Sequence, residues 1–181
     1  MPKSLNFTKD PEANELNASD PMALIVGYTL DQQVTVPKAF GGPLEIKKRL
    51  GTLDAETLAS TDLEPVFREK PSIHRYPAAM AKRVSEVAAH IRDEYDGDAA
   101  RIWTDAKDTD ELRANILALP GFGPMKVWSL GAVLSKQFGV KAADPLVPDH
   151  ITLGDVNSME DLREYQALKK IHKKEWNAQI V

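Results

Sequence analysis

Cysteine is absent from this chain of 181 residues. Without a thiol the chain cannot form a disulfide, a thiolate zinc site, a cysteine nucleophile or a cysteine-ligated iron–sulfur cluster. The four histidines are scattered along the sequence, so a histidine-rich metal site is not expected either. The composition therefore predicts a protein without a bound metal.

Long apolar runs are also missing. No stretch of about 18 apolar residues could cross a membrane, and the N-terminal MPKSLNFTKDPEANEL has two early lysines but no apolar segment typical of a secretion signal. We expect a cytoplasmic protein. With 43% hydrophobic residues, we expect one unit over residues 1–181. Within it, a central helical lobe covers 20–130, and residues 1–19 with 131–181 form a second lobe.

Acidic residues are missing from one long segment, Leu112 to Ala143, although the chain as a whole carries a net charge of −4. Six basic residues face two glutamates from Arg68 to Arg92, and KKIHKK at Lys169–Lys174 adds a third basic cluster. The overall charge argues against a nucleic-acid-binding protein, whereas these segments favour one. Each cluster taken alone is also compatible with an ordinary solvated face.

Sustained period-two alternation, the signature of strands, is absent. Apolar residues recur instead every three or four positions, most regularly at Met80, Val84, Val87, Ile91 and Tyr95. The sequence therefore predicts an all-α fold, a compact multi-helix bundle of two lobes with a cleft between them. The expected helices cover 20–33, 39–50, 54–60, 63–67, 77–95, 98–105, 108–119, 124–138 and a last helix that begins at Ser158, with 142–157 as one long loop.

The stretch LPGFGPMK, residues 119–126, interrupts two of these helices with two glycines and two prolines. Pro120 blocks the first helix, Gly121 and Gly123 allow positive φ, and Pro124 suits the first position of the next helix. One interpretation is an ordinary turn between helices. The other is an anion site, because the free N–H groups of such a turn suit a DNA phosphate.

Three segments carry a resemblance to a known family. ILALPGFGPMKVWSLGAVL looks like the helix-hairpin-helix element of the base-excision DNA glycosylase (HhH-GPD) superfamily. PMALIVGYTLDQQVTVPKA resembles its early helix with a Gln-Gln turn, and HRYPAAMAKRVSEVAAHI is similar to a further helix. The three lie in the family's order between Asp20 and Asp155. The chain is most similar to small, cysteine-free bacterial members, which implies a location at the nucleoid.

The resemblance implies base excision: a damaged base is extruded from the duplex and its N-glycosidic bond is hydrolysed beside an aspartate. The family carries that aspartate shortly after the second hairpin helix. Asp149 in VPDHITL is the first candidate and Asp155 in LGDVNSMEDL the second, while Asp144 precedes a proline and suits a turn. For Asp149 and His150, capping of a loop turn is the competing interpretation.

Bifunctional members carry a strand-cleaving lysine two residues after the second hairpin glycine. Met125 stands there, and Lys126 is rotated by about 100° on a helix, so we expect a monofunctional hydrolase. The resemblance implies double-stranded DNA as the partner of a monomer and no cofactor, leaving open a monovalent cation at the hairpin. It implies DNA contacts at Gln33, Arg75, Lys82, Gly121, Phe122, Gly123, Met125 and Lys126, and a base pocket that includes Tyr28, Trp128 and His150.

Two other functions remain open on the sequence alone. A DNA-binding or lesion-sensing module could keep the fold and lack the chemistry, which the acidic isoelectric point and the long spacing from the hairpin to Asp149 favour. A helical scaffold that binds protein is the third possibility, for which the basic last helix is the one indication. The identity of the damaged base cannot be read from the sequence.

Overall fold

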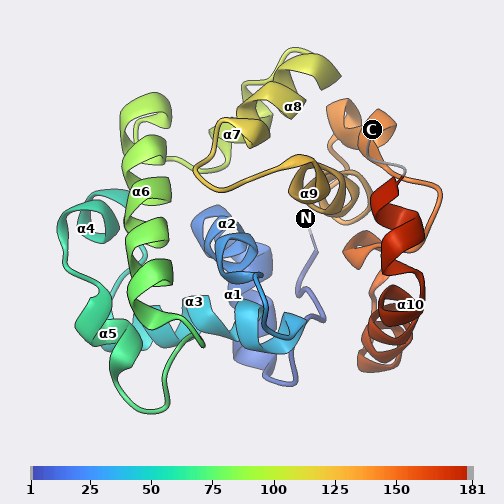
Figure 1. The fold of residues 1–181 in the computed structure, drawn as a ribbon. Coiled ribbons are helices and arrows are strands. Elements are labelled where there is room, and N and C mark those ends of the chain that lie inside the picture. The colour runs from blue at the N-terminus through green and yellow to red at the C-terminus, as the bar shows by residue number, and fades with distance from the viewer. Residues whose placement is uncertain (1, 179–181) are drawn as a thin grey trace.

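A computed structural model describes residues 2–178, which form helices and loops without any strand. The predicted all-α class is thus confirmed (Figure 1). None of the helices in this described part is long and apolar enough to cross a membrane. The α-helices are α1 (Pro11–Ser19), α2 (Pro21–Leu30), α3 (Val36–Leu50), α4 (Ala55–Ser60), α5 (Glu64–Arg68), α6 (Pro77–Tyr95), α7 (Arg101–Thr104), α8 (Thr109–Leu117), α9 (Pro124–Lys136) and α10 (Met159–Ala178).

Local capping chemistry explains where many of these helices begin. The side chains of Asp10, Asp20, Asp54 and Asp108 each accept a hydrogen bond from a backbone N–H in the first turn of the following helix. Such caps satisfy donors that the helix itself leaves unpaired. Proline occupies the first or second position of several helices, where its missing N–H costs no hydrogen bond.

The structure differs from the predicted elements in three places. Residues 11–19 form a helix that the periodicity did not indicate, because only Ala13, Asn14, Asn17 and Ala18 are buried. Helix α3 begins at Val36 and runs through Gly41–Pro43, since close packing of Gly42 against Leu30 offsets the poor helix propensity of this segment. The long loop after α9 contains two short 3-10 helices, η1 (Lys141–Leu146) and η2 (Leu153–Asp155).

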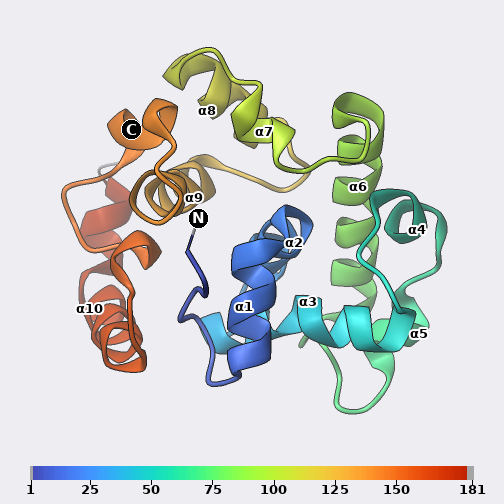
Figure 2. The same cartoon turned by 180° about the vertical axis from the view of Figure 1, so that it is seen from behind.

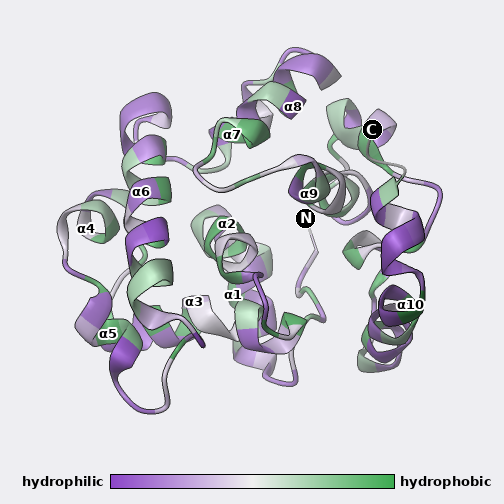
Figure 3. Ribbon diagram, viewed as in Figure 1, coloured by the Kyte–Doolittle hydropathy of each residue, from purple (hydrophilic) through white to green (hydrophobic). Residues whose placement is uncertain are grey.

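Helix α2 lies at the centre of the core. Every residue from Met22 to Leu30 is buried, and α1, α3 and α6 pack around it (Figures 1 and 2). Gly27 allows the ring of Phe40 to approach the α2 backbone, since a Cβ at this position would overlap that ring. Figure 3 shows that α2 is mostly hydrophobic, whereas α10 carries many hydrophilic residues.

Helix α9 joins this core to the C-terminal part of the chain. It packs against both η1 and η2, where Gly131 contacts Leu146 and Gly154 contacts the backbone of Ala132. Helix α10 follows η2 on the outside, and only Leu162 and Tyr165 of this helix are buried. The end of α2, the start of α9 and the inner side of α10 thereby face one another.

Candidate functional site

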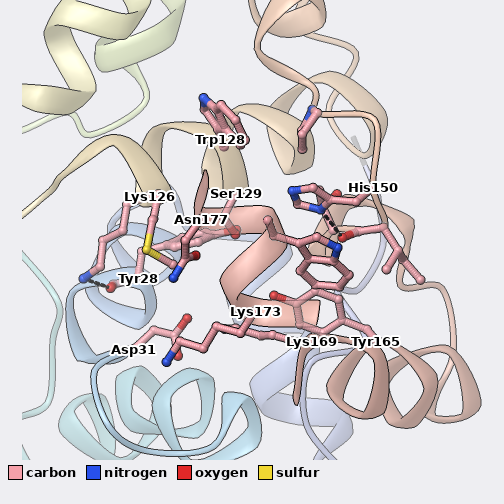
Figure 4. A pocket seen from close by; sticks show the side chains of 15 residues that line it. Tyr28, Asp31, Lys126, Trp128, Ser129, His150, Tyr165, Lys169, Lys173 and Asn177 are labelled. Atoms are coloured by element: carbon pink, nitrogen blue, oxygen red, sulfur yellow. Dashed lines mark hydrogen bonds between the residues drawn. The ribbon is translucent and has the colours of Figure 1, made fainter. Parts of the chain in front are cut away.

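A cavity of about 200 Å³ lies among these elements. Its walls come from the end of α2, the first turns of α9, the loop residues Pro148 and His150 to Thr152, and α10 from Tyr165 onward (Figure 4). Apolar surface predominates in the lining, with a few charged groups on the α2, α9 and α10 sides. Such a mixture is typical of sites for small organic groups.

Asp31 is the carboxylate that lines this cavity in the described chain. It follows the last residue of α2 directly, where its backbone N–H donates to the carbonyl oxygen of Tyr28 over 3.3 Å. Desolvation raises the pKa of Asp31 and outweighs the opposing attraction of the Lys169 and Lys126 ammonium groups. A desolvated carboxylate is a stronger base than one in water, so Asp31 is suited to accept a proton.

Lys126, from the first turn of α9, reaches the same cavity. Its Nζ donates a hydrogen bond of 2.6 Å to the carbonyl oxygen of Tyr28 and lies 4.9 Å from the centre of the Phe122 ring. Desolvation lowers the pKa of this lysine to about 8. The Asp31 charge opposes this shift, and the Arg83 charge adds to it. The ammonium therefore points into the molecule and not away from the turn.

Aromatic side chains form much of the remaining wall. The rings of His150 and Trp176 stack with centroids 4.3 Å apart and planes 3° from parallel. The ring centroids of Trp128 and His150 are 6.2 Å apart, and those of Tyr165 and Trp176 are 6.4 Å apart. Flat π surfaces of this kind suit a planar heterocycle.

Two polar groups lie among these rings. His150 Nδ1 is 3.0 Å from the carbonyl oxygen of Ile151, which can only accept, so Nδ1 carries a proton. Its Nε2 has no hydrogen-bond partner within residues 2–178. The Tyr28 hydroxyl is paired instead, 3.1 Å from the Ser129 hydroxyl. His150 thus keeps a buried ring nitrogen without a partner among the described residues, and Asp31 supplies the carboxyl group that lines the cavity.

The turn between α8 and α9 lies beside the cavity, because Met125 and Lys126 in the first turn of α9 line the cavity. Gly121 is exposed with a φ of +79°, and the Arg83 guanidinium occupies the space that a Cβ would need. Gly123 has open space around its Cα. In the described chain the N–H groups of Gly123 and Met125 show no partner, whereas Phe122 is buried under the turn.

The two aspartates favoured by the sequence lie elsewhere. Asp149 is exposed and does not line the cavity, although its neighbour His150 does. Asp155 caps η2 and pairs with Lys136; against desolvation, hydrogen bonds from Lys136 and Thr152 hold its pKa below the usual range. Asp144 accepts a 2.6 Å hydrogen bond from Ser135. Structural partners thus account for Asp144 and Asp155.

Other predicted DNA contacts form a separate exposed group. The Tyr76 hydroxyl donates to the side-chain oxygen of Gln33 over 3.1 Å, and the Arg75 guanidinium lies 5.5 Å from the Tyr76 ring centre. Gln33 has a φ of +56°, a conformation that is strained for a residue with a side chain. Lys82 is exposed on α6, 4.0 Å from Glu86.

Sequence reasoning brought Tyr28, Trp128 and His150 to one pocket, and all three line the cavity. It did not assign Asp31 or Tyr165 to this pocket, and it noted Lys169 and Lys173 only as part of the basic run KKIHKK. Asp31 immediately precedes the Gln-Gln pair, which is the one sequence signal that could have drawn attention to it.

Comparison of the chain with protein-family models, curated protein sequences and solved structures returns no match.

Proposed function

We propose that the protein is a monofunctional DNA glycosylase that hydrolyses the N-glycosidic bond of a damaged base extruded into the cavity. The observation that carries this proposal is the combination of a carboxyl group, Asp31, with aromatic walls in one cavity beside the start of α9. A base outside its stack needs flat surfaces on which to rest and polar groups for its edge.

The turn between α8 and α9 supports DNA as the carrier of that base. In this proposal α8, the turn and α9 form a helix-hairpin-helix element whose Gly123 and Met125 N–H groups contact backbone phosphates, as the sequence resemblance implies. Phosphate contacts at this point hold the duplex next to the cavity. Lys126 is better suited to the cavity than to a phosphate on the turn, because its Nζ donates to Tyr28.

Asp31 takes the catalytic role that the sequence assigned to Asp149 or Asp155. Loss of the base leaves positive charge on the sugar, which a nearby carboxylate stabilises, and the same group can remove a proton from the attacking water. The raised pKa of Asp31 favours this second task. Water supplies the new C1′–O bond and the departing base takes the electron pair of the broken C–N bond.

A second candidate function is binding of damaged DNA without base removal. One observation favours it: Asp144, Asp149 and Asp155, the carboxylates of the loop after α9, do not line the cavity. In that case Asp31 would contact the edge of the base, and the protein would mark the lesion for other enzymes.

A panel of duplexes with single damaged or mispaired bases separates the two functions. We expect base release by the native protein, detected as alkali-labile sites, and a single-turnover rate lowered about 100-fold or more in Asp31→Asn. Asp149→Asn, an equal change on the exposed loop, serves as the matched control and should stay within a few-fold of the native rate. Binding without release from any duplex would favour the sensing function, and strand scission without heat or alkali would contradict the monofunctional assignment.

A further inference from the structure

The basic run at Lys169–Lys174 has no part in the function described so far. Two of its members, Lys169 and Lys173, line the cavity and also a shallower hollow that adjoins it. Residues four apart share one face of a helix, so α10 presents these two ammonium groups on one side (Figure 4). Trp176 of the same helix also lines the cavity. The basic wall and part of the aromatic wall therefore belong to the same helix.

Among the described residues, no carboxylate forms an ion pair with the lysines of this wall. The ion pair within this run joins His172 to Glu175, and in the described chain Lys169 and Lys173 have no carboxylate within 4.0 Å. Lys169 lies 5.7 Å from the ring centre of Tyr165. Three lysines and one aspartate line the cavity, so its charge favours an anion even when Asp31 is ionised.

The second half of α10 is held in place by few packing contacts. Beyond Tyr165 no residue up to Ala178 is fully buried, and the main attachment of this half is the stack of Trp176 on His150. A helix of this kind, hydrophilic and loosely packed, gains stability when its unpaired cations meet an anionic ligand.

We propose that Lys169 and Lys173 bind the two backbone phosphates that flank the extruded nucleotide, which makes α10 a second DNA-binding element across the cavity from the α8–α9 turn. This inference rests on the proposed function for the identity of the ligand. The base occupies the aromatic part of the cavity, and its flanking phosphates meet the lysines where the cavity opens into the adjoining hollow.

The salt dependence of duplex binding tests this proposal. Each phosphate contact contributes about 0.9 to the slope of log K against log salt concentration, so Lys169→Gln/Lys173→Gln should lose about 1.8. The control is Lys47→Gln/Lys174→Gln, which removes the same charge from exposed positions that line neither hollow. We expect the control to keep the native slope. Lys169→Arg/Lys173→Arg, which retains both charges, should keep most of the native slope.

An unchanged slope in Lys169→Gln/Lys173→Gln would overturn the proposal, and so would an equal loss in the control pair. A lesion-containing duplex and a free deoxynucleoside monophosphate distinguish the sources of the phosphate. We expect the double variant Lys169→Gln/Lys173→Gln to bind the lesion duplex more weakly than the native protein does. If only binding of the monophosphate were weakened, the lysines would be assigned to a free nucleotide, which would contradict a DNA-binding role. Because the slope is measured without base release, a native protein that binds duplex but removes no base would refute the glycosylase function and leave this test intact.

Discussion

At the scale of single residues, Lys126 carries a partly buried ammonium group whose charged form is disfavoured by desolvation. Its ammonium donates one hydrogen bond to the Tyr28 carbonyl oxygen and contacts the Phe122 ring, yet burial still lowers its pKa to about 8. In the unfolded chain the same group has an ordinary pKa near 10.5. Between these two values the unfolded state binds the proton and the folded state does not, so stability rises with pH in this window.

Replacement of Lys126 by methionine should remove that pH dependence. Methionine removes the charge and is nearly as long, so the free energy of unfolding of the native protein should rise relative to that of the variant as the pH rises from about 8 to 10. The change is at most about 1.4 kcal/mol per pH unit. Urea unfolding across this range measures it, and a difference that stays constant would show that Lys126 is not desolvated.

The rate of base release should report on Asp31 in a similar way. As a base Asp31 acts when ionised, so its raised pKa moves the acidic limb of the pH–rate profile above the usual carboxyl range. Lys169 lowers this pKa, so Lys169→Gln should move the limb further upward. Lys174→Gln, an equal charge change on the same helix but outside the cavity lining, is the control. A limb that responds to both or to neither would exclude Asp31 as the titrating group.

At the scale of elements, close approach between α9 and η2 fixes the loop that carries His150. A Cβ on Gly154 would lie 2.5 Å from the carbonyl oxygen of Ala132, and helix backbone cannot move aside easily. In contrast, Gly41 within α3 has nothing within 4 Å of an added Cβ. The two glycines therefore differ in why they are tolerated: the first is required by packing and the second is not.

Substitution of each by alanine should have opposite effects on the free energy of unfolding. Gly154→Ala should destabilise the protein by about 1–3 kcal/mol through overpacking. Gly41→Ala should stabilise it by about 0.5–1 kcal/mol because alanine is the better helix former. Chemical denaturation gives both values. Equal effects of the same sign would contradict the packing described for α9 and η2.

At the scale of the whole molecule, the cavity arises because the end of α2, the start of α9, the loop before η2 and α10 meet in the fold. Helical periodicity and capping residues predicted most elements, since both depend on neighbours along the chain; α6 at Pro77–Tyr95 is the clearest case. The role of Asp31 could not be predicted in the same way. Its pKa is raised because the fold desolvates the carboxyl group, against the attraction of Lys169 and Lys126, and local patterns do not reveal this burial.

The charged residues of the cavity could be predicted from the sequence only in part. Lys169 and Lys173 belong to a run that resembles an ordinary solvated face, and only the position of α10 brings them to the cavity. Asp149 and Asp155 stand in segments that resemble a family motif, yet Asp155 caps η2 and Asp149 faces solvent. Pattern alone cannot tell a cap from a catalytic carboxylate, because both favour loop positions next to short helices.

The most direct test of whether an extruded base enters the cavity beside Asp31 is a crystal structure with a damaged duplex. The damaged nucleotide is fluorinated at the 2′ position, so that it resists loss of its base. We expect the extruded base in the cavity against the aromatic wall of Trp128, His150 and Trp176, with the Asp31 carboxyl near its sugar and the α8–α9 turn on the backbone. A base that remains stacked in the duplex while the cavity stays empty, or a duplex bound on another face, would contradict it.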